Sequence, residues 1–324
     1  MSPVTARLPG FFVSGRCTMP RCCIHPSKRN PSMSTPLTLR HGPLRCDICP
    51  ELGGSIAGMW MYEVPVMRST PGTELTSVRQ SASFPLVPFS NRIGYGQLQW
   101  SGTSHPLVKN FDPEPHTIHG IGWERPWTVL ESTESFALLA MEHKADAAWP
   151  FDFDCSQVFK LEDGALEMSL SVTNQSRTPA PVGLGWHPYF VKRADATVRF
   201  AASGRWEMAA DKLPTHREPH AGLIQPTAAL TVDHCFDGWD GVLTLKDSQL
   251  QVTVRSALSR LVVFTTPERD NIAVEPVSHV NNALNLMGAT GASAESLGVV
   301  TLQPGESFSC SMRVEVRSTE EVQA

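Results

Sequence analysis

The sequence predicts an all-β protein, a large antiparallel β-sandwich with long loops, on three observations. Apolar and polar residues alternate with period two in several segments, which places one face of each segment on a core and the other in water. The 26 prolines and 23 glycines are scattered between short apolar runs, which is typical of a chain with many turns. Helical periodicity is weak throughout, and residues 283–287 are expected to form a single turn of helix and no more.

The predicted strands are clearest where this alternation is unbroken. Residues 166–173 read LEMSLSVT, and the preceding pair Asp163-Gly164 predicts a hairpin turn before them. Residues 250–254 alternate in the same way. So do residues 308–316, which follow a predicted turn at Pro304-Gly305. Each of these segments is therefore expected to be a strand with one buried face.

The length and composition predict one large β domain over residues 33–324. A chain of 324 residues with 41% hydrophobic content can bury a sizeable core, and residues 36–318 contain no recognisable linker. Residues 1–32 are rich in Arg, Pro and Cys and lack periodicity. We interpret them as a disordered extension or a misassigned start, with Met33 as the alternative first residue.

Charge and cysteine content exclude several classes of partner. The net charge is -5 and no basic stripe occurs, so we expect no nucleic-acid partner. No run of about 18 apolar residues predicts a membrane helix. Cys46 and Cys49 form a C-x-x-C pair without a second pair of ligands, so we expect no metal and interpret the eight cysteines as free thiols of a cytoplasmic protein. The oligomeric state stays open.

Five clusters of polar and aromatic residues interrupt the strand pattern. We expect them at strand ends or in loops, where β-proteins usually build their binding sites. Residues of these types suit a sugar, because aromatic rings cover its C–H faces and Arg, Asp and His bind its hydroxyls. Two histidines and a carboxylate would suffice for proton transfer at a hemiacetal. The clusters are residues 90–93, 116–120, 186–190, 233–239 and 274–279.

Each candidate also has an ordinary structural explanation. Alone, His187 is more simply a buried core histidine, Arg92 a surface ion-pair partner and Glu275 a solvated loop carboxylate. Asp233 could form a turn through its side chain. At least two of the four tryptophans at positions 123, 127, 186 and 239 are expected to lie in the core.

Taken together, six motifs in order resemble the aldose 1-epimerase (galactose mutarotase) family over about residues 40–316. The sequence departs from the family's usual motifs at two places, and these departures bear on the identity of the substrate more than on the type of reaction. They are Val191-Lys192 after Phe190 and Ile121 between two glycines. The motifs are Leu52-Gly53-Gly54, Asn91-Arg92-Ile93, His119-Gly120-Ile121-Gly122 with Arg125-Pro126-Trp127, His187-Pro188-Tyr189-Phe190, Asp233-His234-Cys235-Phe236 and Glu275-Pro276.

The resemblance implies a galactose mutarotase-like supersandwich that interconverts the anomers of a free hexose without a cofactor. It implies that Glu275 is the base at the anomeric hydroxyl and His187 the acid at the ring oxygen. These two groups are expected to meet across one open pocket at sugar-ring distance. His119, the third catalytic candidate, and Arg92 would hold the sugar oxygens. The remaining candidates for binding the monosaccharide are Asp233, with Asp237 and Asp240 as alternatives, Asn91 and Trp239.

Three other functions stay open at this stage. A hexose-6-phosphate 1-epimerase would need cationic groups at the site, for which Lys109 and Arg125 are the nearest candidates by motif. A non-catalytic sugar-binding module on the same fold would need the aromatic residues and Asp233, but not both His187 and Glu275. Glycoside hydrolysis fits poorly, because only one candidate carboxylate stands in a motif beside the histidines.

Overall fold

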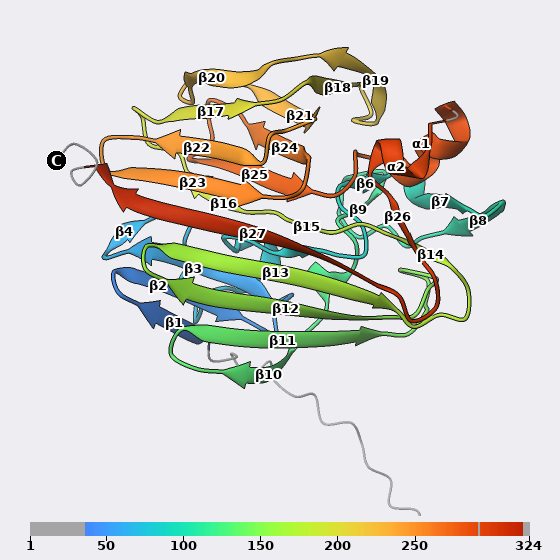
Figure 1. The fold of residues 1–324 in the computed structure, drawn as a ribbon, viewed down its shortest axis with the longest axis horizontal. Helices are drawn as coiled ribbons and strands as arrows, with labels where there is room; N and C mark the ends of the chain where they lie inside the picture. The colour runs from blue at the N-terminus through green and yellow to red at the C-terminus, as the bar shows by residue number, and fades with distance from the viewer. Residues whose placement is uncertain (1–35, 291, 320–324) are drawn as a thin grey trace, which may run out of the picture. The chain divides into compact units, whose positions relative to one another are not determined.

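Antiparallel β-sheets make up most of the protein (Figure 1). The structure is a computed structural model that describes residues 36–290 and 292–319. These described residues belong to one compact unit, Ser34–Ala324. The hypothesis for residues 1–32 lies outside the described residues. The all-β sandwich predicted from the sequence is confirmed.

Two large sheets form the framework. The larger has nine strands, in the order β10 (Thr128–Ser132), β11 (Phe136–His143), β12 (Phe153–Glu162), β13 (Ala165–Asn174), β27 (Ser307–Ser318), β23 (Leu250–Ser256), β22 (Val242–Lys246), β17 (Thr197–Ala201) and β20 (Gly222–Pro226). The other has eight strands, in the order β19 (Pro214–Pro219), β18 (Gly204–Met208), β21 (Val232–Asp237), β24 (Arg260–Thr265), β25 (Asn271–Val277), β15 (Gly185–Trp186) and β5 (Pro85–Leu86), with β16 (Tyr189–Val191) also paired to β25.

Smaller elements complete the described part of the chain. A four-stranded sheet holds β1 (Leu37–His41), β2 (Leu44–Cys49), β3 (Ser55–Met61) and β4 (Val64–Pro65). Three strand pairs are β6 (Arg92–Ile93) with β9 (Thr117–Ile118), β7 (Gln97–Trp100) with β8 (Thr103–Pro106), and β14 (Ala180–Val182) with β26 (Val300–Leu302). The helical elements are η1 (Val78–Gln80), η2 (Gly94–Gly96), η3 (Gly122–Glu124), α1 (Ala283–Thr290) and α2 (Ala294–Leu297).

The predicted alternating segments are strands of the nine-stranded sheet. β12 and β13 form the expected hairpin, and Gly164 turns it with a φ of 68°. The segments beginning at Leu250 and Phe308 lie in β23 and β27, which pair antiparallel. The expectation of a single helical turn at 283–287 is wrong, because α1 has eight residues. Ala283, Leu284 and Leu286 in its first half are all buried.

One hydrophobic core joins the eight-stranded and nine-stranded sheets. Trp186 on β15 is fully buried, and its indole Nε1 donates to Oε1 of Gln157 on β12 at 3.2 Å. The Gln157 amide in turn donates to the carbonyl of Gly54 at 3.0 Å. Since neighbouring side chains along an extended chain point to opposite faces, His187 faces away from this core.

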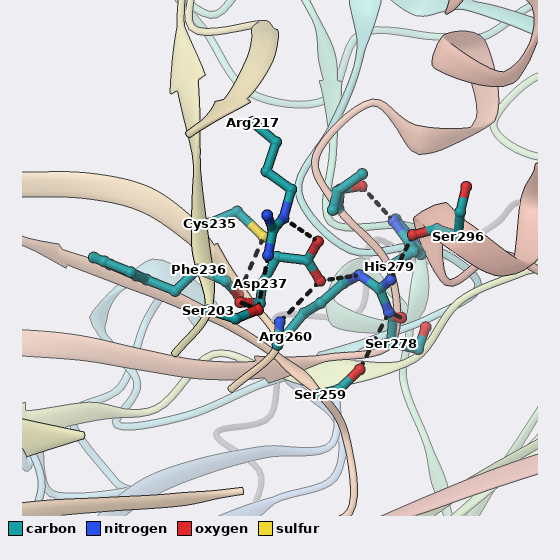
Figure 2. A network of polar contacts seen from close by, with 12 residues as sticks. Ser203, Arg217, Cys235, Phe236, Asp237, Ser259, Arg260, Ser278, His279 and Ser296 are labelled. Carbon is teal, nitrogen blue, oxygen red and sulfur yellow. Dashed lines mark hydrogen bonds and ion pairs between the residues drawn. The ribbon is translucent and has the colours of Figure 1, made fainter. Parts of the chain in front are cut away.

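A polar network around the buried Arg260 secures one end of the eight-stranded sheet (Figure 2). The guanidinium of Arg260 on β24 donates to the carbonyl of Ser278 at 3.1 Å and to that of Ser296 on α2 at 2.7 Å. Its Nε lies 3.3 Å from the carboxylate of Asp237, which also binds Arg217 at 3.0 Å. These bonds fix the loop after β25 against β21 and β24.

Candidate active site

The floor of the candidate site is one face of the eight-stranded sheet. Tyr189 on β16 lies opposite Ala273 on β25, Ala273 opposite Phe264 on β24, and Phe264 opposite Asp233 on β21. Directly opposite residues share a face, so these four side chains form one cross-strand row. Glu275, two residues beyond Ala273, lies in the adjacent row on the same face.

His187 and Glu275 meet on this floor. Nε2 of His187 lies 3.2 Å from Oε1 of Glu275, and both side chains are buried. The imidazole packs against the rings of both Phe84 and Tyr189, with centroid distances of 4.8 and 4.5 Å. Within the described residues, Nδ1 of His187 and Oε2 of Glu275 are buried without a hydrogen-bond partner. Such groups are costly to bury unless a ligand satisfies them.

Burial moves the proton equilibria of this pair in opposite directions. Desolvation raises the pKa of the Glu275 carboxyl well above its usual value, and the nearby charge of Asp233 raises it further. Desolvation also lowers the pKa of the His187 imidazole, with a smaller effect from His119. Both shifts favour the uncharged forms, so a proton resides on the carboxyl while the imidazole can accept one.

His119 lies beside the His187–Glu275 pair and forms a wall of the candidate site. Its ring lies 5.1 Å from that of His187, edge to face, and its Nδ1 is buried without a partner among the described residues. Desolvation lowers its pKa to about 3, so the ring is neutral. His119 and Gly120 both have positive φ, and a Cβ on Gly120 would lie 2.1 Å from the carbonyl oxygen of Val87. Only glycine fits here, which explains the His-Gly motif.

Asn91 and Arg92 lie beside this wall, because β6 pairs with β9. Arg92 forms a two-point ion pair with Glu114, at 2.8 and 3.3 Å. Asn91 has positive φ, and its side-chain oxygen accepts bonds from the backbone and guanidinium of Arg92. Arg92 therefore faces the site as a paired rather than a free cation, and this pairing lowers the pKa of the Glu114 carboxyl.

Asp233 is the aspartate of its motif that reaches the site. It lines the cavity that also contains His187 and Glu275, and its carboxylate forms an ion pair with Lys212 at 3.2 Å. Asp237 belongs to the network of Figure 2, and Asp240 caps a turn through the N–H of Val242.

The structure does not bring Trp239 to the site. Its side chain is buried in the core, and its indole Nε1 donates to the carbonyl of Val242 at 3.0 Å. Trp239 follows Gly238, a turn residue with a φ of 64°. Trp127 and Trp186 also lie in the core, whereas Trp123 is buried and lines the cavity.

These residues enclose a cavity of about 330 Å³, within the size range of small-molecule sites. It brings together six of the seven predicted residues, Asn91, Arg92, His119, His187, Asp233 and Glu275. Further lining residues that sequence reasoning did not select are Arg68, Arg79, Phe84, Phe111, Glu114, Ile118, Trp123, Tyr189, Val262, Phe264 and Arg269. Of these, Tyr189 stood in a recognised motif, and Ile118 and Trp123 stood directly beside one.

The clusters 233–239 and 274–279 each run from a strand into the following loop, as expected, although Glu275 itself lies inside β25, two residues before its end. The expected position of the phosphate candidates is wrong. Lys109 and Arg125, the phosphate candidates, line a separate surface depression, where Arg125 pairs with Asp146 at 3.0 Å.

The described residues offer no cluster of three or more His, Cys, Asp or Glu side chains placed to bind a metal ion. Cys46 and Cys49 are free and buried, and burial raises the pKa of the Cys49 thiol to about 11. In the same part of the chain, no helix is long and apolar enough to cross a membrane. The imidazoles and carboxylates that line the cavity can transfer protons and form hydrogen bonds.

Comparison with known proteins identifies the family of the chain. The family model for aldose 1-epimerase matches residues 36–315. The chain belongs to the aldose 1-epimerase family. The uncharacterised protein YphB of Escherichia coli K12 is 29% identical over 298 residues, which cover 86% of this chain and 98% of YphB.

Solved structures of aldose 1-epimerase relatives share the fold. A candidate aldose 1-epimerase from Escherichia coli K12 superposes with a TM-score of 0.78 at 26% identity, over 88% of this chain and 99% of that one. A galactose mutarotase-like protein from Clostridium acetobutylicum gives 0.77 at 17% identity, over 87% and 95%. Galactose 1-epimerase from Lactobacillus acidophilus gives 0.70 at 14% identity, over 87% and 94%. The last two likenesses concern the fold alone.

Proposed function

We propose that this protein interconverts the α and β anomers of an aldose, with His187 and Glu275 exchanging protons with the sugar. The observation that carries the proposal is the 3.2 Å approach of Nε2 and Oε1 inside one cavity, with further polar atoms of both groups buried and unpartnered. Membership of the aldose 1-epimerase family supports the same reaction.

The spacing of the pair suits mutarotation. Ring opening needs a proton delivered to the ring oxygen and another removed from the anomeric hydroxyl. These two oxygens are bonded to one carbon, so the groups that serve them must also lie within a few ångströms of each other. The two groups therefore need to reach only the two oxygens of one carbon, which is a shorter separation than the sugar-ring distance that the resemblance implies.

In the proposed reaction, the carboxyl proton of Glu275 first passes to His187 across their 3.2 Å contact. The Glu275 carboxylate then takes the proton of the anomeric hydroxyl while the protonated His187 gives one to the ring oxygen. The open-chain aldehyde rotates about its first C–C bond, and the two groups exchange roles as the ring closes on the other face. The raised pKa of Glu275 makes its carboxylate a stronger base than an exposed one. His119 and the Arg92–Glu114 pair would hold sugar oxygens during opening, and Asp233 would accept hydroxyl hydrogen bonds.

Anomer exchange measured by NMR or polarimetry tests this proposal. The variant Glu275→Gln keeps the shape of the side chain but removes the base, so kcat should fall at least about 100-fold while KM changes little. His187→Asn should behave alike. Glu142→Gln is the matched control, because Glu142 is an exposed residue of β11 outside the cavity.

Three outcomes separate the possibilities. Loss of exchange in both site variants but not in the control supports the proposal. Near-full activity of Glu275→Gln contradicts it. Sugar binding by the unaltered protein without faster exchange identifies a non-catalytic binding module instead.

A further inference from the structure

Three arginines line the cavity without a carboxylate to balance them. Within the described residues, none of Arg68, Arg79 and Arg269 forms an ion pair with an acidic side chain, whereas Arg92 does. Each guanidinium instead lies over an aromatic ring. The pairs are Arg68 over Tyr189 at 3.9 Å, Arg79 over Phe111 at 3.7 Å and Arg269 over Phe264 at 4.4 Å.

The acidic residues of the cavity are already engaged. Glu114 is held by Arg92, Asp233 by Lys212, and Glu275 by His187. Burial favours the uncharged form of Glu275. The cavity therefore presents an excess of positive charge, which a neutral sugar would not use.

Arg68 is held firmly at this wall. Its guanidinium donates to the carbonyls of Arg79 and Ser81, the former at 2.8 Å. Burial lowers its pKa, and the like charge of Arg269 contributes to the same effect. Asp270, the nearby carboxylate, accepts a 2.6 Å hydrogen bond from the side chain of Asn271 and forms no ion pair with Arg68 among the described residues. Two guanidinium groups that face one space are best stabilised by an anion between them.

We propose that the substrate is an aldose with an anionic substituent, a phosphate, sulfate or carboxylate, which Arg68, Arg79 and Arg269 bind while His187 and Glu275 act on the anomeric centre. Guanidinium groups match the oxygens of such anions in two-point contacts, and the aromatic rings beneath them fix their planes in advance. This inference rests on the proposed epimerase function and narrows it from hexoses in general to charged ones.

Anomer-exchange NMR with glucose, glucose 6-phosphate, glucose 6-sulfate and glucuronate tests the inference. At least one charged sugar should give a kcat/KM at least about tenfold above that of glucose, as expected for hydrogen bonds between charged groups. Its KM should rise with added NaCl, because salt screens the attraction. Which of the three charged sugars is preferred identifies the anion.

Substitutions of the cavity arginines test which residues cause the preference for a charged sugar. Arg269→Gln should lower the ratio of kcat/KM for the charged sugar to that for glucose by about tenfold, mainly through KM. Arg79→Gln, which removes a solvent-exposed arginine, is a second variant in case the first unfolds. Arg199→Gln is the matched control, because Arg199 is exposed on β17 away from the cavity, and it should leave the ratio unchanged.

Two failures can be told apart. Exchange of glucose that equals or exceeds exchange of every charged sugar overturns the inference but leaves the proposed function standing. Exchange of no sugar overturns the proposed function. Calorimetric titration with glucose 6-phosphate and glucose then decides the inference, which fails if the charged sugar does not bind more tightly.

Discussion

Mild acid should destabilise this protein through His279, a buried histidine in the loop after β25. Its side chain is 1% exposed, and its Nε2 accepts a 3.0 Å hydrogen bond from the backbone N–H of Ser90. Nδ1 lies 2.7 Å from the carbonyl of Val280, so it carries the proton. A second proton on Nε2 would abolish the bond to Ser90 and bury a charge. Accordingly, desolvation lowers the pKa of His279 to about 4, against the opposing effect of the Val280 carbonyl.

The sign and size of the effect follow from proton linkage. The folded-state pKa is depressed below the unfolded value of 6.5, so the unfolded chain binds the proton more tightly. The stability that the neutral ring contributes is complete above pH 6.5 and is lost as the pH falls towards 4. At about 1.4 kcal/mol per pKa unit, the full loss is about 3 kcal/mol, of which about 2 kcal/mol is gone at pH 5.

Urea unfolding at pH 7 and pH 5, followed by tryptophan fluorescence, measures this loss. The variant His279→Gln retains an acceptor for the Ser90 N–H but cannot titrate, so its free energy of unfolding should fall about 2 kcal/mol less than that of the unaltered protein. The other buried histidines are present in both proteins, so their contributions to the pH dependence of the free energy of unfolding cancel in the comparison. His216→Gln, at an exposed position on β19, is the control and should change nothing. Equal losses for His279→Gln and the unaltered protein would refute the reasoning.

Two further substitutions test the geometry of the site. Gly120→Ala should destabilise the protein by more than about 2 kcal/mol, because the new Cβ would combine a positive φ with a clash against Val87. Gly102→Ala also places a Cβ at positive φ but in open space, so it should cost only about 1–2 kcal/mol. Urea unfolding of the two variants measures the difference. Trp239→Phe loses one buried hydrogen bond to Val242 and should lower stability by about 1 kcal/mol without altering the sugar KM; a several-fold rise in KM would show that Trp239 does reach the substrate.

Sequence periodicity predicted the strands whose two faces differ. Segments such as β13 and β27 alternate because one side contacts the core and the other is more exposed. β25 does not alternate, since all seven of its residues are buried, one face by the core and the other by the cavity walls. Periodicity therefore did not show that Glu275 lies inside a strand, and only its motif identified it as a candidate.

The site was predicted only as far as motifs extend. The residues of the His-Gly and Asn-Arg motifs converge as expected. Phe84, Arg68 and Arg269 line the same cavity but stand in no motif, and only the fold brings them there. Trp239 illustrates the opposite case, because a motif-adjacent aromatic residue can belong to the core as readily as to a sugar platform.

Trp186 and His187 are neighbours that serve opposite sides of the same sheet, one bound into the core and the other into the proposed proton-transfer centre. A mutation that repacks the interior around Trp186 would also shift the imidazole of His187. The position of the proton-transfer group is therefore tied to the packing of the core. Arg68, Arg79 and Arg269 come instead from connecting segments after β4, from η1 and from the turn between β24 and β25. Substitutions in these connecting segments could therefore change which sugar is preferred while the reaction at the anomeric centre stays the same.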